Sequence, residues 1–495
     1  MVGLKRVGLN NTRGRTSPAA GAAPPRQDRP SEPTLDDKLR FLRQALSDPA
    51  TGAPPEALET HMSWVFLTRD RALKLKKPVR HDRLDFTTLA AREFNCREEL
   101  RLNARLAPGI YLGLMALRQE GDGRLALRPE PQGERSLGDV RQGDVQQGTV
   151  PQGDMAQGNA PQGPGASRPE SPRPATPPRP PARTVDWLVL MRRLPHERLL
   201  PQLIAAGRVE TAQIDALARV LTRFFRHAAP APLPPQDYLA RLRRERATDR
   251  AVLTGRSVAQ GQESDQGLDQ GSGRALRTGG GMNMTPSVAS ASGLHRLDPA
   301  VLPPGAAQAL DRLDAALTRH AALLGSRAAA LVEGHGDLRP EHVGLLDPPV
   351  VIDCLEFSVA LRQTDPIDEL AFLAMECGLL AERPPESPDG SVNPRWLDPR
   401  AIGPRLISAC TAALGKAPPP ALLPLYTACR ALLRARLILA HLLDPQPRTP
   451  GQWPPLARRY VAVAVAALDW LDAVEAVEAA EGTAALSPAA RTGRL

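Results

Sequence analysis

The stretch HGDLRPEH at residues 335–342, followed by the apolar run VVID at residues 350–353, decides the fold of this chain. Asp337 lies in a polar loop, and Asp353 ends an apolar strand, so its carboxylate should project from the strand end. A carboxylate in a loop can orient the proton of an attacking hydroxyl, and one at a strand end can hold a divalent cation. Each acid alone is more often a loop cap bonded to its own backbone. The pair, with a lysine strand upstream, favours phosphoryl transfer.

That upstream strand is predicted over residues 72–76, after a first strand over 64–67 and a polar turn. Lys74 and Lys76 alternate with apolar residues, so both should point to one face of a sheet. Either ammonium group could neutralise the phosphates of a nucleotide, and the sequence leaves the choice between them open. A solvated pair of edge-strand lysines is the simpler alternative.

A long helix is predicted over residues 87–106, and it should carry an acidic partner for the lysine. Glu98 and Glu99 are the candidates, and Glu93 is less favoured. The turn before the two strands lacks a glycine-rich phosphate-binding pattern. Cover for the phosphates would therefore come from backbone amides and from the hydroxyls of Thr60 or Ser63.

Together these segments resemble the aminoglycoside phosphotransferase-like branch of the protein-kinase-like superfamily, and in particular its uncharacterised bacterial members. The segments that carry the resemblance are THMSWVFL at 60–67, KLKKP at 74–78, EELRLN at 98–103, IDCLEF at 352–357 and DPIDELA at 365–371. The likeness covers roughly residues 56–475 apart from two insertions. It implies an α+β, bilobal protein-kinase-like fold, with a small mixed N-lobe and a larger, mainly helical C-lobe. It also implies ATP and Mg²⁺ as cofactors.

The resemblance assigns roles to individual residues of this chain. Asp337 becomes the catalytic aspartate, which accepts or orients the acceptor proton, and Arg339 becomes a cation facing the transferred phosphate. Asp353 becomes a metal ligand, Met191 belongs to a hinge strand that contacts adenine through its backbone, and Asp368 ties down the catalytic loop.

His342 departs from the template, which has a metal-binding asparagine at this position. A neutral imidazole is a poor ligand for Mg²⁺ but a reasonable one for Mn²⁺. The protein could therefore work with one metal, prefer Mn²⁺, or bind nucleotide without transferring phosphate, and His342 could also simply bond to its own loop. The favoured function is transfer of the γ-phosphate of ATP to a hydroxyl of a small molecule. The alternative is a pseudokinase-like nucleotide-binding or scaffold protein, and a protein-directed kinase is a weaker third.

An aminoglycoside acceptor is disfavoured, because a polycation needs an acidic pocket. Glu356 and Glu369 are candidates for one, but no convergent acidic cluster is visible. The five cysteines form no CxxC pair, which suits a reducing cytoplasm. The N-terminus lacks an apolar signal region, and arginines interrupt the most apolar helical stretch, 422–443, so neither secretion nor a membrane span is expected.

Much of the net charge of +9 lies in the N-terminal tail and the low-complexity stretches, without interleaved aromatic residues, so no nucleic-acid partner is expected. Composition divides the chain into segments with predicted characters. These are a disordered basic tail at 1–34, the N-lobe at 35–128, a low-complexity Gly/Pro/Gln insertion at 129–183, the hinge and first C-lobe helices at 184–256, a second insertion at 257–295, the catalytic C-lobe at 296–480 and a disordered tail at 481–495. The insertions leave a protein partner open.

Overall fold

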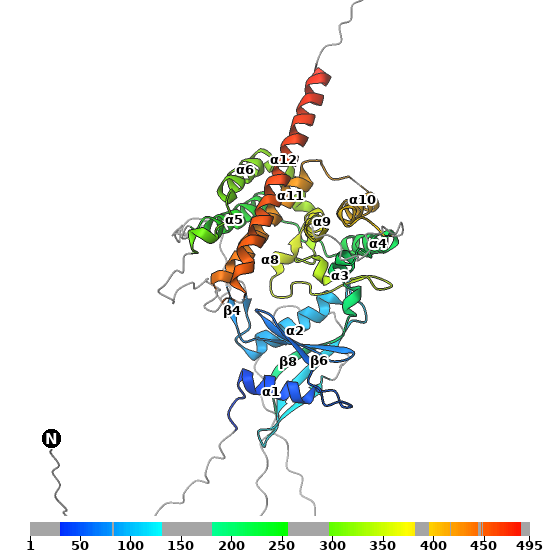
Figure 1. Cartoon of the computed structure of the whole chain (residues 1–495), viewed down its shortest axis with the longest axis vertical. Helices are drawn as coiled ribbons and strands as arrows, with labels where there is room; N and C mark the ends of the chain where they lie inside the picture. The colour runs from blue at the N-terminus through cyan, green and yellow to red at the C-terminus, as the bar shows by residue number, and fades with distance from the viewer. Residues whose placement is uncertain are drawn as a thin grey trace, which may run out of the picture.

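The computed structural model describes residues 30–81, 84–130, 181–255, 297–381, 396–415, 417–443, 447 and 449–486. The predicted tails, 1–34 and 481–495, and the predicted insertions, 129–183 and 257–295, lie largely outside these described residues. Strands concentrate at one end of the molecule and helices at the other (Figure 1). The predicted α+β class, with antiparallel strands and segregated helices, is therefore confirmed.

A six-stranded antiparallel sheet forms the strand-rich end, in the order β1-β2-β3-β8-β6-β7. Its strands are β1 (Glu56–Glu59), β2 (Ser63–Leu67), β3 (Arg71–Lys76), β6 (Tyr111–Gln119), β7 (Leu125–Pro129) and β8 (Arg183–Arg192). A separate short hairpin joins β4 (Arg80–His81) to β5 (Leu84–Asp85). The predicted strands at 64–67 and 72–76 correspond to β2 and β3, and the predicted hinge strand that contains Met191 corresponds to β8, whereas β1, β6 and β7 were not predicted.

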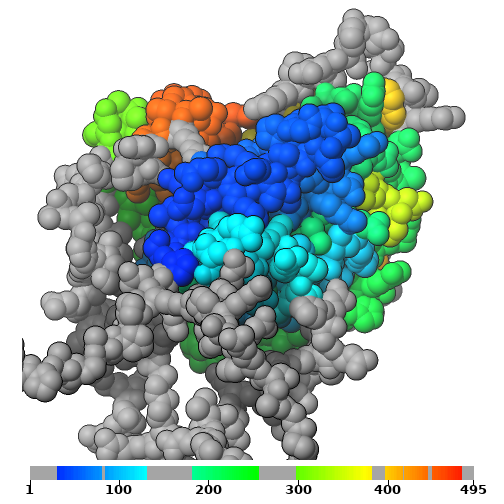
Figure 2. Space-filling view, turned by 90° about the horizontal axis from the view of Figure 1, so that it is seen from below, coloured from blue at the N-terminus to red at the C-terminus, as the bar shows by residue number. Residues whose placement is uncertain are grey.

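Two helices cover the two faces of this sheet. Helix α1 (Leu35–Ala45) begins at a capping box formed by Thr34 and Asp37 and packs Leu39 and Leu42 on one face. Helix α2 (Leu89–Asn103), capped by Thr88, packs on the other face and lies between the sheet and the helical end (Figure 1). Seen from the sheet end, the chain up to β7, in blue and cyan, forms the middle of the visible surface (Figure 2).

The helical end forms one large apolar core. Its α-helices are α3 (Leu200–Ala205), α4 (Thr211–His227), α5 (Pro235–Leu253), α6 (Ala306–Arg319), α7 (Ala321–Arg327), α8 (Val359–Arg362), α9 (Pro366–Ala381), α10 (Ile402–Leu414), α11 (Leu422–Ala440) and α12 (Trp453–Leu486). The short 3₁₀ helices are η1 (His196–Arg198), η2 (Pro299–Val301), η3 (Ala328–Ala330), η4 (Pro340–His342), η5 (Pro399–Ala401), η6 (His441–Leu443) and η7 (Pro450–Gln452). No helix among the described residues is long and apolar enough to cross a membrane.

The HGDLRPEH loop lies where the helical end meets the sheet. Short strands frame it: β9 (Val332–Glu333) pairs with β12 (Gln363–Thr364), and β10 (Val343–Gly344) pairs with β11 (Val350–Val351). The strand predicted over 350–353 ends at Val351 in the structure. Asp353 leaves the extended conformation, with φ of 62°. Asp is among the few residues other than Gly that tolerate this left-handed region.

Candidate active site

Strand β3 and helix α2 bring two lysines onto one carboxylate. Lys74 and Lys76 point to the α2 side of the sheet, as their alternation predicts, and Glu99 reaches both from α2. Glu99 Oε1 lies 3.0 Å from Lys74 Nζ, and Glu99 Oε2 lies 2.7 Å from Lys76 Nζ. The side chains of Glu99 and Lys76 are fully buried, whereas that of Lys74 is 14% exposed.

Two acids that follow β11 complete this cluster from the helical end. Asp353 Oδ1 lies 2.6 Å from Lys74 Nζ, and Glu356 pairs with Lys76 Nζ. Lys74 thus links Glu99 to Asp353, whose side chain is 44% exposed. Lys76 links Glu99 to Glu356 in the interior of the protein. The two lysines therefore differ in access, and Lys74 is the one that a ligand can reach.

Mutual charge stabilisation holds this cluster in its ionised form. Burial alone would lower the pKa of Lys74, but the carboxylates of Asp353 and Glu99 outweigh it and raise that pKa well above its usual value. Burial alone would likewise raise the pKa of Asp353, but Lys74 holds that pKa below its usual range. The pKa of Glu99 is lowered because Lys74 and Lys76 outweigh its burial.

The backbone around Asp353 is fixed by α2 and β6. Its N–H donates to the Tyr111 hydroxyl at 3.1 Å, and the N–H of Cys354 donates to Asn103 Oδ1 at 3.0 Å. Asn103 also donates to the Glu99 carbonyl one helical turn earlier. These contacts hold the left-handed backbone of Asp353 and direct its side chain toward Lys74, an arrangement typical of strained functional residues.

His342 lies between the two predicted acids. Its Nδ1 lies 2.8 Å from the carbonyl oxygen of Asp337, so Nδ1 carries the proton and donates it. The other ring nitrogen, Nε2, lies 3.6 Å from Asp353 Oδ2 and 3.5 Å from a terminal nitrogen of Arg339. The prediction that His342 bonds to its own loop and the prediction that it faces a metal position are thus compatible.

These two donor atoms suit a shared divalent cation. Two ligands that each lie about 2.1 Å from a metal can be 3.6 Å apart, as Asp353 Oδ2 and His342 Nε2 are. Among the described residues no group of three or more His, Cys, Asp or Glu could hold a metal by itself. Such a cation would take its remaining ligands from phosphate oxygens and water, as nucleotide-bound metals do.

Asp337 and Arg339 form an ion pair within the loop. Arg339 Nε lies 3.0 Å from Asp337 Oδ1, and 26% of the Asp337 side chain is exposed. Burial alone would raise the pKa of Asp337, but Arg339 outweighs it and holds that pKa below its usual range. Asp337 is therefore ionised at neutral pH and can accept a hydrogen bond from a hydroxyl.

Glu369 on α9 anchors the loop from beneath. Its two carboxylate oxygens accept the backbone N–H groups of His335 and Gly336. A Cβ on Gly334 would lie 2.3 Å from Thr364 Oγ1 and 2.8 Å from Glu369 Oε1, so this position excludes any side chain. The His335 ring is fully buried, its Nε2 donates to the Ile352 carbonyl at 2.9 Å, and its burial lowers its pKa to about 4.

The role that the resemblance gave to Asp368 needs correction. The resemblance gave the role of tying down the loop to Asp368, but Asp368 binds Arg430 through a bidentate pair at 2.7–2.8 Å, and Glu369 ties the loop. Glu356 and Glu369 were candidates for an acidic acceptor pocket. Both are buried and engaged with the chain itself, Glu356 with Lys76 and Glu369 with the loop backbone.

The remaining predicted residues lie on helix α2 and on strands β2 and β8. Glu98 was a candidate partner for the lysines, but its carboxylate pairs with Arg101 at 2.9 Å, so Glu99 makes the contact instead. Ser63 is buried beside Lys76 in the β2–β3 register, and its N–H donates to the Thr60 hydroxyl in the β1–β2 turn. Met191 is buried in the sheet between Ala72 and Tyr111.

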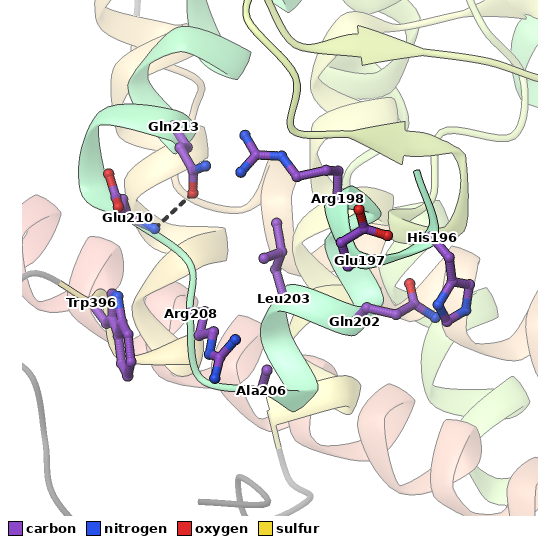
Figure 3. A pocket seen from close by; sticks show the side chains of 10 residues that line it. All are labelled: His196, Glu197, Arg198, Gln202, Leu203, Ala206, Arg208, Glu210, Gln213 and Trp396. Atoms are coloured by element: carbon purple, nitrogen blue, oxygen red, sulfur yellow. Dashed lines mark hydrogen bonds between the residues drawn. The ribbon is translucent and has the colours of Figure 1, made fainter. Parts of the chain in front are cut away.

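A separate cavity of about 470 Å³ opens beside η1, α3 and the start of α4. Figure 3 shows Arg198, Glu197 and His196 on one side of it and Arg208, Glu210 and Trp396 on the other. Its lining includes both acidic and basic side chains. None of the predicted site residues lines it.

The comparisons with known proteins give limited information. No protein-family model matches the chain. Uncharacterised proteins of Mycobacterium tuberculosis and Mycobacterium bovis are 25% identical over 424 residues, which is 85% of this chain and 61% of each relative. The chain thus spans about three fifths of the length of these curated relatives. A choline/ethanolamine kinase family protein from Mesorhizobium loti superposes with a TM-score of 0.39 and 13% identity, over 89% of this chain and 99% of that protein.

Proposed function

We propose that this chain is an ATP-dependent phosphotransferase with a bilobal protein-kinase-like fold, which moves the γ-phosphoryl group to a hydroxyl of a small molecule. The observation that carries the proposal is the position of Lys74. It joins Glu99 of the sheet end to Asp353 of the helical end, and His342 lies between Asp353 and the second acid, Asp337. An ion-pair cluster that served stability alone would not need Asp353 to be 44% exposed and to adopt a left-handed backbone conformation.

In this proposal the residues on the Asp353 side of His342 bind the nucleotide and its metal, and those on the Asp337 side bind the acceptor. On the Lys74 side, the ammonium group would compensate charge on the nucleotide phosphates, as cations do in phosphoryl transfer. Asp353 Oδ2 and His342 Nε2 would hold the divalent cation, which supplies charge neutralisation when bound. An imidazole in this set favours Mn²⁺ more than an asparagine would.

On the other side, Asp337 would orient the acceptor. Its carboxylate accepts the hydrogen bond of the acceptor hydroxyl and takes its proton as the oxygen forms a bond to the γ-phosphorus. The bond to the β-phosphate oxygen breaks, and ADP leaves with that electron pair. Arg339 keeps Asp337 ionised and could also contact the transferred group.

A second candidate, nucleotide binding without transfer, is favoured by one specific observation. One oxygen of the Asp353 carboxylate is already paired with Lys74, and the neighbouring metal position has an imidazole instead of an amide. In that case the site would bind ATP and the metal, and the protein would respond to nucleotide without consuming it.

The test is detection of phosphoryl transfer by the full chain. Purified protein is incubated with ATP, Mg²⁺ or Mn²⁺ and a pool of small-molecule extract, and new phosphate esters are followed by phosphorus NMR. Wild type should form esters and ADP, whereas Asp337→Asn should lose about 10²-fold or more of the rate while still binding ATP. Equal rates for the two proteins would refute the role of Asp337. ATP binding without any ester would favour the second candidate.

A further inference from the structure

Three aromatic rings are in contact where the sheet end meets the helical end. His61 lies in the turn between β1 and β2, and its ring centroid lies 4.5 Å from that of His441 in η6, with the two ring planes only 10° apart. Trp453, the first residue of α12, extends this stack, because its ring centroid lies 4.6 Å from that of His441. The start of α12 points toward the sheet end (Figure 1). The ring stack therefore joins the β1–β2 turn to η6 and α12.

The β1–β2 turn is bound to the residue that follows β3. The Thr60 hydroxyl donates to the Ser63 carbonyl at 3.0 Å and accepts the Ser63 N–H at 2.9 Å, which closes the turn. The N–H of Lys77 donates to the Met62 carbonyl at 2.8 Å, and Lys77 Nζ donates to the Thr60 carbonyl at 2.6 Å. A contact that fixes the His61 ring therefore fixes the whole turn and not only one side chain.

This turn lies at the end of β3 that carries the two lysines. Ser63 is opposite Lys76 in the β2–β3 register, and Lys74 lies two residues earlier on the same strand. Two residues of an antiparallel strand span about 7 Å, so phosphates bound at Lys74 can reach the turn. Among the described residues the N–H of Met62 has no acceptor, so it is available to a phosphate oxygen.

Two features favour a role of the ring stack in the site over a role in stability alone. His61 is exposed, so its ring contact removes little apolar surface from water, which is the main source of stability from aromatic side chains. The turn at residues 60–62 also contains no glycine, so it lacks the backbone freedom with which glycine-rich loops fold around phosphates. Its position then has to be set by an outside contact, and His441 supplies one.

We propose that His61 positions the β1–β2 turn over the phosphates of a bound nucleotide, and that η6 and α12 hold this closed position through the ring stack. The inference rests on the proposed phosphotransferase function and adds a positioning residue to its nucleotide site. The His61 side chain contacts neither the nucleotide nor the metal, and it acts through the backbone of the turn. Without the stack the turn is free to open, and the affinity for phosphates falls with the fraction of molecules that stay closed.

The test compares a ligand that has phosphates with one that lacks them. The full chain is titrated calorimetrically with AMP-PNP and Mn²⁺, and the affinity for adenosine is measured by its competition with AMP-PNP. An aromatic pair can shift an equilibrium by about three- to tenfold. His61→Ala should therefore weaken AMP-PNP binding by that factor and leave adenosine binding unchanged. A ring contact that served only the fold would change neither affinity, or both equally.

Further variants assign the effect to the ring stack. His61→Phe keeps an aromatic ring and should retain most of the AMP-PNP affinity. His441→Ala should weaken AMP-PNP as His61→Ala does, and the double variant should be no weaker than either single one, because each removes the same contact. The control is His227→Ala. His227 is also exposed, but its ring bonds to the Arg223 carbonyl within α4, so its loss should change neither affinity.

Failure of the inference can be separated from failure of the function. If AMP-PNP binds wild type and His61→Ala equally tightly, the inference is wrong and the phosphotransferase proposal stands. The inference is also refuted by equal weakening of AMP-PNP and adenosine, by additive effects of His61→Ala and His441→Ala, or by the same loss in His227→Ala. If AMP-PNP does not bind wild type, or adenosine does not compete with it, both the function and the inference are wrong.

Discussion

Replacing Glu99 with glutamine should destabilise the protein, because Glu99 is the shared partner of two buried lysines. Its side chain is fully buried, and its two oxygens contact Lys74 and Lys76 at 3.0 and 2.7 Å. An amide of the same shape would keep an acceptor for one lysine and present an N–H donor to the other. Lys76, which is also fully buried, would keep only Glu356 as a charged partner.

The expected cost follows from these contacts. Removing one partner from a buried ion pair costs about 3–5 kcal/mol. Lys74 retains Asp353 and Lys76 retains Glu356, so Glu99→Gln should lie near the lower end, at about 3 kcal/mol. The neighbouring Glu98→Gln is a matched control. Glu98 is 21% exposed and pairs with Arg101, which is 38% exposed, so its loss should cost about 1 kcal/mol or less.

The assay is urea unfolding of the full chain followed by tryptophan fluorescence, since Trp64 and Trp187 lie in the sheet. The two variants differ by one position and by the same chemical change, so general effects of charge removal cancel. A loss below about 1 kcal/mol for Glu99→Gln, or equal losses for the two variants, would show that Glu99 is not the electrostatic centre of the cluster.

Three further predictions concern the loop. His342→Asn should raise the rate with Mg²⁺ relative to Mn²⁺, measured as ADP release with each metal, and an unchanged ratio would exclude His342 as a ligand. Gly334→Ala should lower the free energy of unfolding in urea by about 2 kcal/mol or more, because the added Cβ would overlap Thr364 and Glu369. The control is Gly378→Ala in α9, where no atom lies within 4 Å of the added Cβ and the protein should gain about 0.5–1 kcal/mol. The reverse order of the two variants would contradict the loop geometry. Burial lowers the pKa of His335 from 6.5 to about 4, so the unfolded chain binds this proton more readily than the folded protein does. About 3 kcal/mol of stability should therefore be lost as the pH falls from about 6.5 to 4. His335→Gln should remove that part of the pH dependence of unfolding, and an unaltered pH profile would refute the prediction.

The sequence predicted the elements that carry the site better than the contacts within it. Alternation of lysine with apolar residues gave β3 and its face correctly, because the period of two is a local property. It could not choose between Lys74 and Lys76, since both bind Glu99 and differ in access and in a second acidic partner from a distant segment, Asp353 for Lys74 and Glu356 for Lys76. The choice between Glu98 and Glu99 depended on the exact phase of α2. Asn103 lies four residues after Glu99 and therefore on the same face of α2. A polar residue at this spacing was a signal that Glu99, and not Glu98, faces the site.

Other features depend on contacts between distant segments. Glu369 reaches the backbone of the loop from α9, and nothing near it in the sequence shows this. The left-handed backbone of Asp353 depends on Tyr111 and, through the N–H of Cys354, on Asn103, and both lie far away in the chain. Strand β6 was missed because its run YLGLMALRQ does not alternate strictly and cannot be separated from a helix by pattern alone.

The central claim is that Asp353 and Lys74 form a working metal–nucleotide site, and thermal unfolding with ligand tests it most directly. Wild type and Asp353→Ala are heated with ATP alone, with ATP and Mg²⁺, and with ATP and Mn²⁺. A ligand at 100 times its Kd stabilises by about 2.7 kcal/mol, which gives a clear rise in Tm. The account predicts a metal-dependent rise for wild type that Asp353→Ala loses. No rise with either metal, or an equal rise in both proteins, would contradict it.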